Sequence, residues 1–163
     1  MCGIIGFVGN EPAAPILLDG LERMEYRGYD SAGVAVRSET AGLQVRKTKG
    51  RLKVLSDLIH GGADLEGNLG IGHTRWATHG EPNDINAHPH VSENGRIAIV
   101  HNGIIENYLE LKEHLMRQGV HFTSDTDTEV VAQLLEFHYN ECHNMLEAVG
   151  RCLRRIEGSY AFG

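Results

Sequence analysis

Cys2 stands directly after the initiator methionine, at the head of the apolar segment 1–6 (MCGIIG). Methionine aminopeptidases remove Met1 when the next side chain is small, and its removal would leave a thiol and a free α-amino group on one residue. An α-amino group has a pKa of about 7.7–8.0, so a useful fraction of it is unprotonated near neutral pH. Cys2 could then act as a nucleophile with its own amine as the general base. Taken alone, it is more often a small apolar residue at the start of a strand.

Two further segments carry groups that an amide-cleaving nucleophile needs. The side-chain amide of Asn102 and the backbone N–H of Gly103 could both donate to the oxyanion of a tetrahedral intermediate, although Asn-Gly is also a common turn. Thr126 and Glu129 have capping-box spacing ahead of an apolar helix. Asp127 would then lie in the first turn, where the helix dipole favours an acid, and it could also neutralise a substrate ammonium group.

The segment 72–80 (GHTRWATHG) concentrates polar and aromatic groups between two glycines. Arg75 offers a planar guanidinium group that binds a carboxylate in bidentate fashion. Thr78 and His79 could add neutral donors, and Trp76 is the only tryptophan. The alternative is a surface ion pair for Arg75 and a packing role for Trp76.

The ten histidines raise the alternative of a metal-dependent hydrolase. His88 and His90, with His79 or His101, could assemble an imidazole site, but the sequence has no HExxH pattern or Cys/His set typical of zinc. It has no glycine-rich phosphate-binding motif either. We therefore expect no metal and no cofactor.

Composition sets the broad class of the protein. The 163 residues carry a formal charge of -7, which disfavours nucleic acid as a partner, and 41% of them are hydrophobic, enough for a core. No apolar run approaches the ~20 residues of a membrane-spanning helix, and the N-terminus does not read as a signal peptide. The three cysteines are too few and too scattered for a disulfide framework, and we expect Cys142 and Cys152 to be inert packing residues. We predict a soluble, cytoplasmic, single domain.

The chemistry-bearing residues fall between segments of clear periodicity. Apolar patterning predicts strands at 3–8, 34–36, 43–47, 69–74, 96–100 and 159–162, and helices at 51–60, 107–118, 126–140 and 144–156, with a further helix opened by Glu11-Pro12. The stretch from Arg75 to Gly95 has no periodicity and is long enough to be a functional loop. Strands and helices without regular βαβ alternation predict an α+β fold or a layered sandwich.

Taken together, the segments resemble the class II glutamine amidotransferases, which are N-terminal-nucleophile hydrolases. Within that class they are most similar to the members that pass ammonia to fructose 6-phosphate. The matching segments are 1–6 (MCGIIG), 26–33 (YRGYDSAG), 73–80 (HTRWATHG), 86–90 (NAHPH), 101–107 (HNGIIEN) and 126–129 (TDTE). The resemblance implies an α+β, four-layer αββα sandwich. It also implies that residues 1–163 form one amidotransferase domain, incomplete at its C-terminus and without the sugar-phosphate isomerase domains.

The resemblance assigns catalytic roles to four residues. Cys2 would be the nucleophile and its freed α-amino group the base. Asn102 and Gly103 would form the oxyanion hole, and Arg27 would help to organise the loop beside the nucleophile.

It assigns substrate binding to five residues. Arg75 would hold the α-carboxylate of glutamine, helped by Thr78 and His79, and Asp127 would take the α-ammonium group. Trp76 matches the residue that gates the ammonia route, in a loop that closes over bound glutamine.

The implied reaction is hydrolysis of L-glutamine to glutamate through a Cys2 thioester. The ammonia would convert fructose 6-phosphate into glucosamine 6-phosphate in the full-length enzyme, which is expected to be a homo-oligomer. Three alternatives stay open: a glutamine-binding module without catalysis, an amidotransferase domain that serves another acceptor, and the metal-dependent hydrolase.

Overall fold

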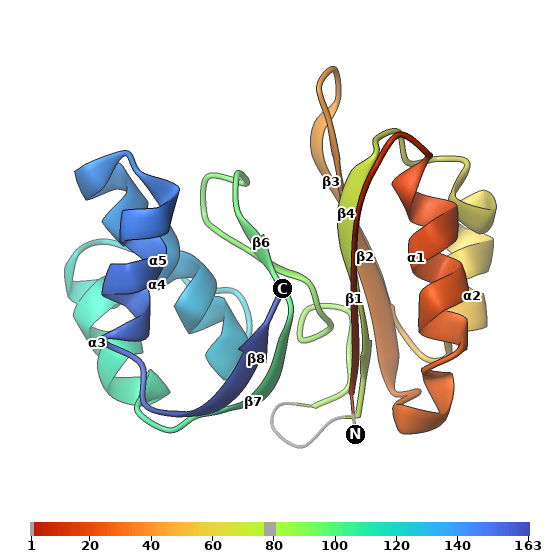
Figure 1. Ribbon diagram of the computed structural model, residues 1–163. Coiled ribbons are helices and arrows are strands. Elements are labelled where there is room, and N and C mark those ends of the chain that lie inside the picture. Colours follow the sequence, from red (N-terminus) through yellow and green to blue (C-terminus); the bar gives the residue numbers. More distant parts are fainter. Residues whose placement is uncertain (1, 77–80) are drawn as a thin grey trace.

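The computed structural model describes residues 2–76 and 81–163, which form two β layers between two layers of helices (Figure 1). The first β layer is a four-stranded antiparallel sheet in the order β1-β4-β2-β3. Its strands are β1 (Gly3–Val8), β2 (Ser31–Ser38), β3 (Gly42–Lys49) and β4 (Leu69–Arg75), and α1 (Ala13–Glu22) and α2 (Leu52–Leu58) cover its outer face. Two 3₁₀ turns, Glu25–Arg27 and His60–Gly62, complete this half.

The second half repeats this layering with shorter strands. Two antiparallel pairs form its β layer, and three helices pack outside them (Figure 1). The pairs are β5 (His90–Val91) with β6 (Ala98–Ile99) and β7 (His101–Ile105) with β8 (Gly158–Phe162), and the helices are α3 (Tyr108–Arg117), α4 (Asp127–Cys142) and α5 (Met145–Leu153). The predicted α+β, four-layer αββα sandwich is confirmed. No helix in the described ranges is long and apolar enough to cross a membrane.

Each helical layer has its own apolar core. Leu17 and Leu21 of α1 and Leu55 of α2 are fully buried against Val34 and Val36 of β2. Strand β2 is buried along almost its whole length because helices cover one face and the second β layer covers the other. A separate cluster joins α3, α4 and α5 to the other sheet pairs.

Several strand boundaries differ from the sequence prediction: the expected strand 34–36 extends over Ser31–Ser38, and β5 lies in a stretch expected to be loop. The difference at residues 96–105 bears on the site. The expected strand 96–100 is instead the two-residue β6, and β7 begins at His101 and contains the Asn-Gly pair that we weighed as a turn. Strand β7 exists because β8, more than fifty residues later, supplies its hydrogen-bond ladder. Asn and Gly have low intrinsic strand propensity, so no local signal marks it.

The stretch 81–91, expected to be loop, packs against the first sheet. The ammonium group of Lys47 donates to the carbonyl oxygens of Ile85 (2.9 Å) and Ala87 (2.6 Å). This burial lowers the pKa of Lys47 to about 8. The backbone N–H of Lys49 donates to Asp84 Oδ1 (2.7 Å), so two residues of β3 hold the stretch in place.

The start of α4 is capped differently from the predicted capping box. Thr126 Oγ1 accepts from the Glu129 backbone N–H (3.4 Å), as expected. The Glu129 carboxylate, however, accepts from the backbone N–H groups of Thr123 (2.9 Å) and Ser124 (2.6 Å) instead of reaching back to Thr126. The turn before the helix is therefore fixed, and with it the position of Asp127.

Gly33 permits close approach of the 81–91 stretch to the first sheet. A Cβ atom at Gly33 would collide with the carbonyl oxygen of His88 and lie 2.6 Å from Lys47 Cβ, whereas a Cβ atom at Gly6 of β1 would meet no atom within 4 Å. We expect Gly33→Ala to lower the free energy of unfolding by about 1–3 kcal/mol through overpacking. Gly6→Ala is the matched control and should change it by less than about 0.5 kcal/mol. Urea unfolding measures both, and equal effects would contradict the proposed packing constraint.

Candidate active site

A cavity of about 600 Å³ opens where the end of β4 meets the start of β1, β7 and the first turn of α4. Its size is that of a small-molecule site. Among the residues predicted to act in catalysis or binding, Cys2, Arg27, Arg75, Trp76, Asn102, Gly103 and Asp127 all line it. The predicted donors Thr78 and His79 lie outside the described residues. The remaining lining residues are His73, His88, His101, Ile104, Tyr108, Thr126, Thr128 and Ser159.

The thiol of Cys2 is held by the backbone of Trp76. The Trp76 N–H donates to Cys2 Sγ (3.2 Å), and Sγ lies 3.6 Å from the Trp76 carbonyl oxygen. The Trp76 ring meets the Tyr29 ring edge-on at 5.5 Å. Gly28 lets the backbone of Arg75 and Trp76 pack closely against it, because a Cβ atom at Gly28 would lie 2.8 Å from the carbonyl carbon of Arg75. Arg27, on the preceding 3₁₀ turn, donates from Nε to the Tyr26 hydroxyl (3.0 Å).

Asn102 approaches Cys2 from the other β layer. Its Nδ2 donates to the Cys2 carbonyl oxygen (3.2 Å). The next residue, Gly103, has a φ of +125° and packs so tightly on β8 that a Cβ atom would collide with the carbonyl oxygen of Ser159. Only glycine fits this position without strain.

Arg75 and Asp127 bring opposite charges to the same cavity. Arg75, at the end of β4, is only 5% exposed. Burial lowers the pKa of its guanidinium group, while Cys2, Asp127 and Asp30 act in the opposite direction. Asp127 lies in the first turn of α4, and its Oδ2 accepts the backbone N–H of Ile105 (2.8 Å). The cavity therefore offers a cation, an anion and a thiol.

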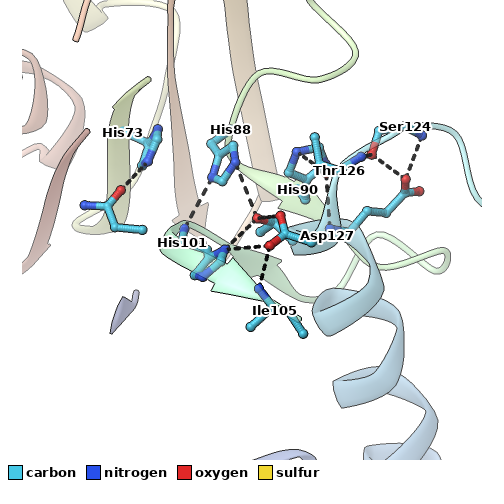
Figure 2. A network of polar contacts seen from close by, with 11 residues as sticks. His73, His88, His90, His101, Ile105, Ser124, Thr126 and Asp127 are labelled. Atoms are coloured by element: carbon cyan, nitrogen blue, oxygen red, sulfur yellow. Dashed lines mark hydrogen bonds and ion pairs between the residues drawn. The ribbon is translucent and has the colours of Figure 1, made fainter. Parts of the chain in front are cut away.

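A cluster of buried histidines fills the space between the two β layers (Figure 2). The His73 ring stacks on His88 with centroids 4.2 Å apart, and His88 meets His90 edge-on at 4.9 Å. His101 Nδ1 lies 2.9 Å from Thr128 Oγ1. Burial lowers the pKa of His73 to about 4, and it lowers the pKa of His88 and His90 well below 6.5. These imidazoles are therefore neutral at pH 7.

In the sequence, His88, His90 and His101 are candidates only as metal ligands. Within residues 2–76 and 81–163, no group of three or more His, Cys, Asp or Glu side chains is arranged to hold a metal ion. The sequence prediction gives His73 no role. Strand spacing could have placed His73 in the site, because it lies two residues before Arg75 and so points to the same face of the strand.

Solved amidotransferase structures share this fold. The glutamine phosphoribosylpyrophosphate amidotransferase of B. subtilis, solved in complex with ADP and GMP, is 28% identical, with a TM-score of 0.83 over 99% of this chain and 34% of that one. The αββα sandwich, with a cysteine at the head of its first strand and an amide donor beside it, defines the class of N-terminal-nucleophile amidotransferases. The family model described as "Glutamine amidotransferase domain" matches residues 40–163, and the chain belongs to this family.

Alignments with curated relatives extend over almost the whole chain. The glutamine–fructose-6-phosphate aminotransferase (isomerizing) of Caldanaerobacter subterraneus is 58% identical over 163 residues, and that of Thermus thermophilus is 58% identical over 161 residues. These alignments cover 100% and 99% of this chain but only 26% of each relative. The chain thus spans about a quarter of the length of these relatives.

The buried imidazoles predict a steep loss of stability in acid. The unfolded chain binds protons on His73, His88 and His90 near pH 6.5, whereas the folded chain does so only at lower pH. The free energy of unfolding therefore falls as pH drops from about 6.5 towards 4, by up to about 1.4 kcal/mol per pH unit for each imidazole. Urea unfolding between pH 7.5 and 4.5 measures the slope. His88→Gln should reduce it, and a stability that stays flat down to pH 5 would contradict the prediction.

Proposed function

We propose that the chain hydrolyses the side-chain amide of L-glutamine, with Cys2 as nucleophile, and releases glutamate and ammonia. One observation carries the proposal: Cys2, which precedes β1, lines the same cavity as Arg75 of β4, Asn102 of β7 and Asp127 of α4. Family membership supports the same reaction class.

The charges of the cavity match those of glutamine. The α-carboxylate would bind Arg75, whose planar guanidinium group offers paired donors. The α-ammonium group would bind Asp127, whose carboxylate keeps acceptor capacity beyond its bond from the Ile105 N–H. The side-chain amide would then extend towards Cys2. Thr78 and His79 are proposed to add neutral donors. Arg27 is proposed to help organise the loop beside the nucleophile, and Trp76 to gate the route of the ammonia.

The reaction proceeds in two stages. The α-amino group of Cys2, freed by removal of Met1, takes the thiol proton as Sγ attacks the amide carbon. The oxyanion accepts hydrogen bonds from Asn102 Nδ2 and the Gly103 N–H, and the amine returns the proton as ammonia leaves. Water then attacks the γ-glutamyl thioester, which gives glutamate and regenerates the thiol.

The ammonia acceptor is proposed from the relatives alone. Because two relatives are named for fructose 6-phosphate, we infer that this sugar phosphate is the acceptor in a protein of their length, which would make glucosamine 6-phosphate. We place that protein in the cytoplasm and expect it to be a homo-oligomer. Full-length protein that releases glutamate without any stimulation by fructose 6-phosphate would point to another acceptor.

The first test is glutamate release from L-glutamine by the purified chain, after intact mass has shown that Met1 is absent. Cys2→Ala should abolish release, and Asn102→Ala should lower kcat about 10²- to 10³-fold, the loss typical for one oxyanion donor. Glutamine binding without turnover in a folded, processed chain would favour the non-catalytic binding module. Release that survives Cys2→Ala but is lost to chelators would favour the metal-dependent hydrolase.

A second test addresses binding of the α-ammonium group. Asp127→Asn keeps an acceptor for the Ile105 N–H but loses the charge, so KM for glutamine should rise about 10- to 100-fold, the effect of a hydrogen bond to a charged group. Asp125→Asn is the matched control, since Asp125 is exposed and lies outside the cavity lining. Equal KM values for the two variants would remove Asp127 from the binding site.

A further inference from the structure

We propose that His73 is a positioning residue that fixes the orientation of the Asn102 side-chain amide and so makes it an oxyanion donor. The inference rests on the proposed function, because it assumes that Asn102 stabilises the oxyanion. It assigns a task to a buried side chain that the reaction described above leaves unused.

The hydrogen bonds determine which way the Asn102 amide faces. The Cys2 carbonyl oxygen can only accept, so the Asn102 atom 3.2 Å from it must be Nδ2. Oδ1 then faces His73 Nε2 at 2.9 Å. Since an amide oxygen only accepts, His73 must donate from Nε2. Nδ1 of His73 has no hydrogen-bond partner among the described residues, which agrees with a neutral ring protonated on Nε2.

The same arrangement provides the donor that catalysis needs. An amide NH₂ group has two hydrogens; one goes to the Cys2 carbonyl oxygen, and the other is left for an oxygen atom in the cavity that Asn102 lines. If the amide turned by 180°, Oδ1 would face both the Cys2 carbonyl oxygen and the oxyanion, and both contacts would be repulsive. The His73 N–H disfavours that orientation because it would then meet an NH₂ group.

His73 is itself held rigidly. It lies in β4 between β1 and β2, opposite Ile4 on one side and Gly33 on the other. The side chain is 1% exposed, and its ring stacks on His88 at an interplanar angle of 18°. Figure 2 shows His73 at one end of the histidine cluster. The donor therefore approaches Asn102 from a fixed position in the opposite β layer.

The experiment compares three His73 variants in the full chain. His73→Leu removes the donor, and we expect kcat for glutamate release to fall about 10- to 100-fold, less than for complete loss of the amide in Asn102→Ala. KM for glutamine should stay within about threefold. His73→Gln restores a donor at the distance of Nε2 and should recover most of kcat. The side chain of His73→Asn is too short to reach Asn102 Oδ1, so this variant should not recover kcat. The comparison between the Gln and Asn variants remains decisive if the leucine variant fails to fold.

Two controls separate positioning from a general structural role. His90→Leu removes a buried imidazole of the same cluster that bonds to neither Asn102 nor Cys2 and lies outside the cavity lining, so kcat should stay within about threefold. Alkylation of Cys2 by iodoacetamide, mapped by peptide mass spectrometry, needs no oxyanion donor and should keep its rate in His73→Leu.

A double variant tests whether His73 acts through Asn102. His73→Leu combined with Asn102→Ala should be no slower than Asn102→Ala alone, since both changes remove one function. Additive losses, equal kcat in the Gln and Asn variants, or a parallel fall in Cys2 alkylation would overturn the inference. If Asn102→Ala keeps full kcat, the proposed oxyanion hole itself fails. If Asn102→Ala lowers kcat but the His73 variants keep full kcat, the proposed function stands and this inference is wrong.

Discussion

A hydrogen bond at the proposed reaction centre joins the two halves of the sandwich: Asn102 Nδ2 donates to the carbonyl oxygen of Cys2 across 100 residues of sequence. Cys2, the proposed nucleophile, directly precedes the first strand of one sheet, and its proposed amide donor lies in a strand of the other β layer. The proposed reaction thus requires the two layers to keep a fixed separation. Gly33 meets that requirement, because a side chain there would push the backbone of His88 away from the first sheet.

The space between the β layers is filled differently from the rest of the protein. Aliphatic side chains pack the two helical layers, whereas the centre holds imidazoles that are hydrogen-bonded or stacked. Each hydrogen bond in a buried polar network restricts the orientation of the two side chains that it joins, which aliphatic packing does less strictly. Its cost is sensitivity to acid, because His73 and His88 must stay neutral while buried.

Charge in the cavity is arranged by local structure as much as by side-chain type. Asp127 sits in the first turn of α4, where the helix dipole favours an anion, and the turn before it is fixed by the Glu129 carboxylate. Arg75 ends a central strand and is almost fully buried, so its cation stays in place near Asp127 and Cys2. A zwitterion with a remote amide is the ligand that such a pattern fits.

The sequence by itself determined the layered α+β class and most helices, because side-chain types and their periodicity are local properties. Local chemistry also marks six of the seven predicted residues that line the cavity, whereas Arg27 is implied only by the family resemblance. Strand β7 and the hydrogen bond between His73 and Asn102 could not be predicted. The strand depends on pairing with β8, and the hydrogen bond joins residues that are 29 positions apart and lie in different β layers. The sequence states which groups are present. Only the tertiary structure decides which of them meet, since contacts between the two β layers leave no periodicity in either strand.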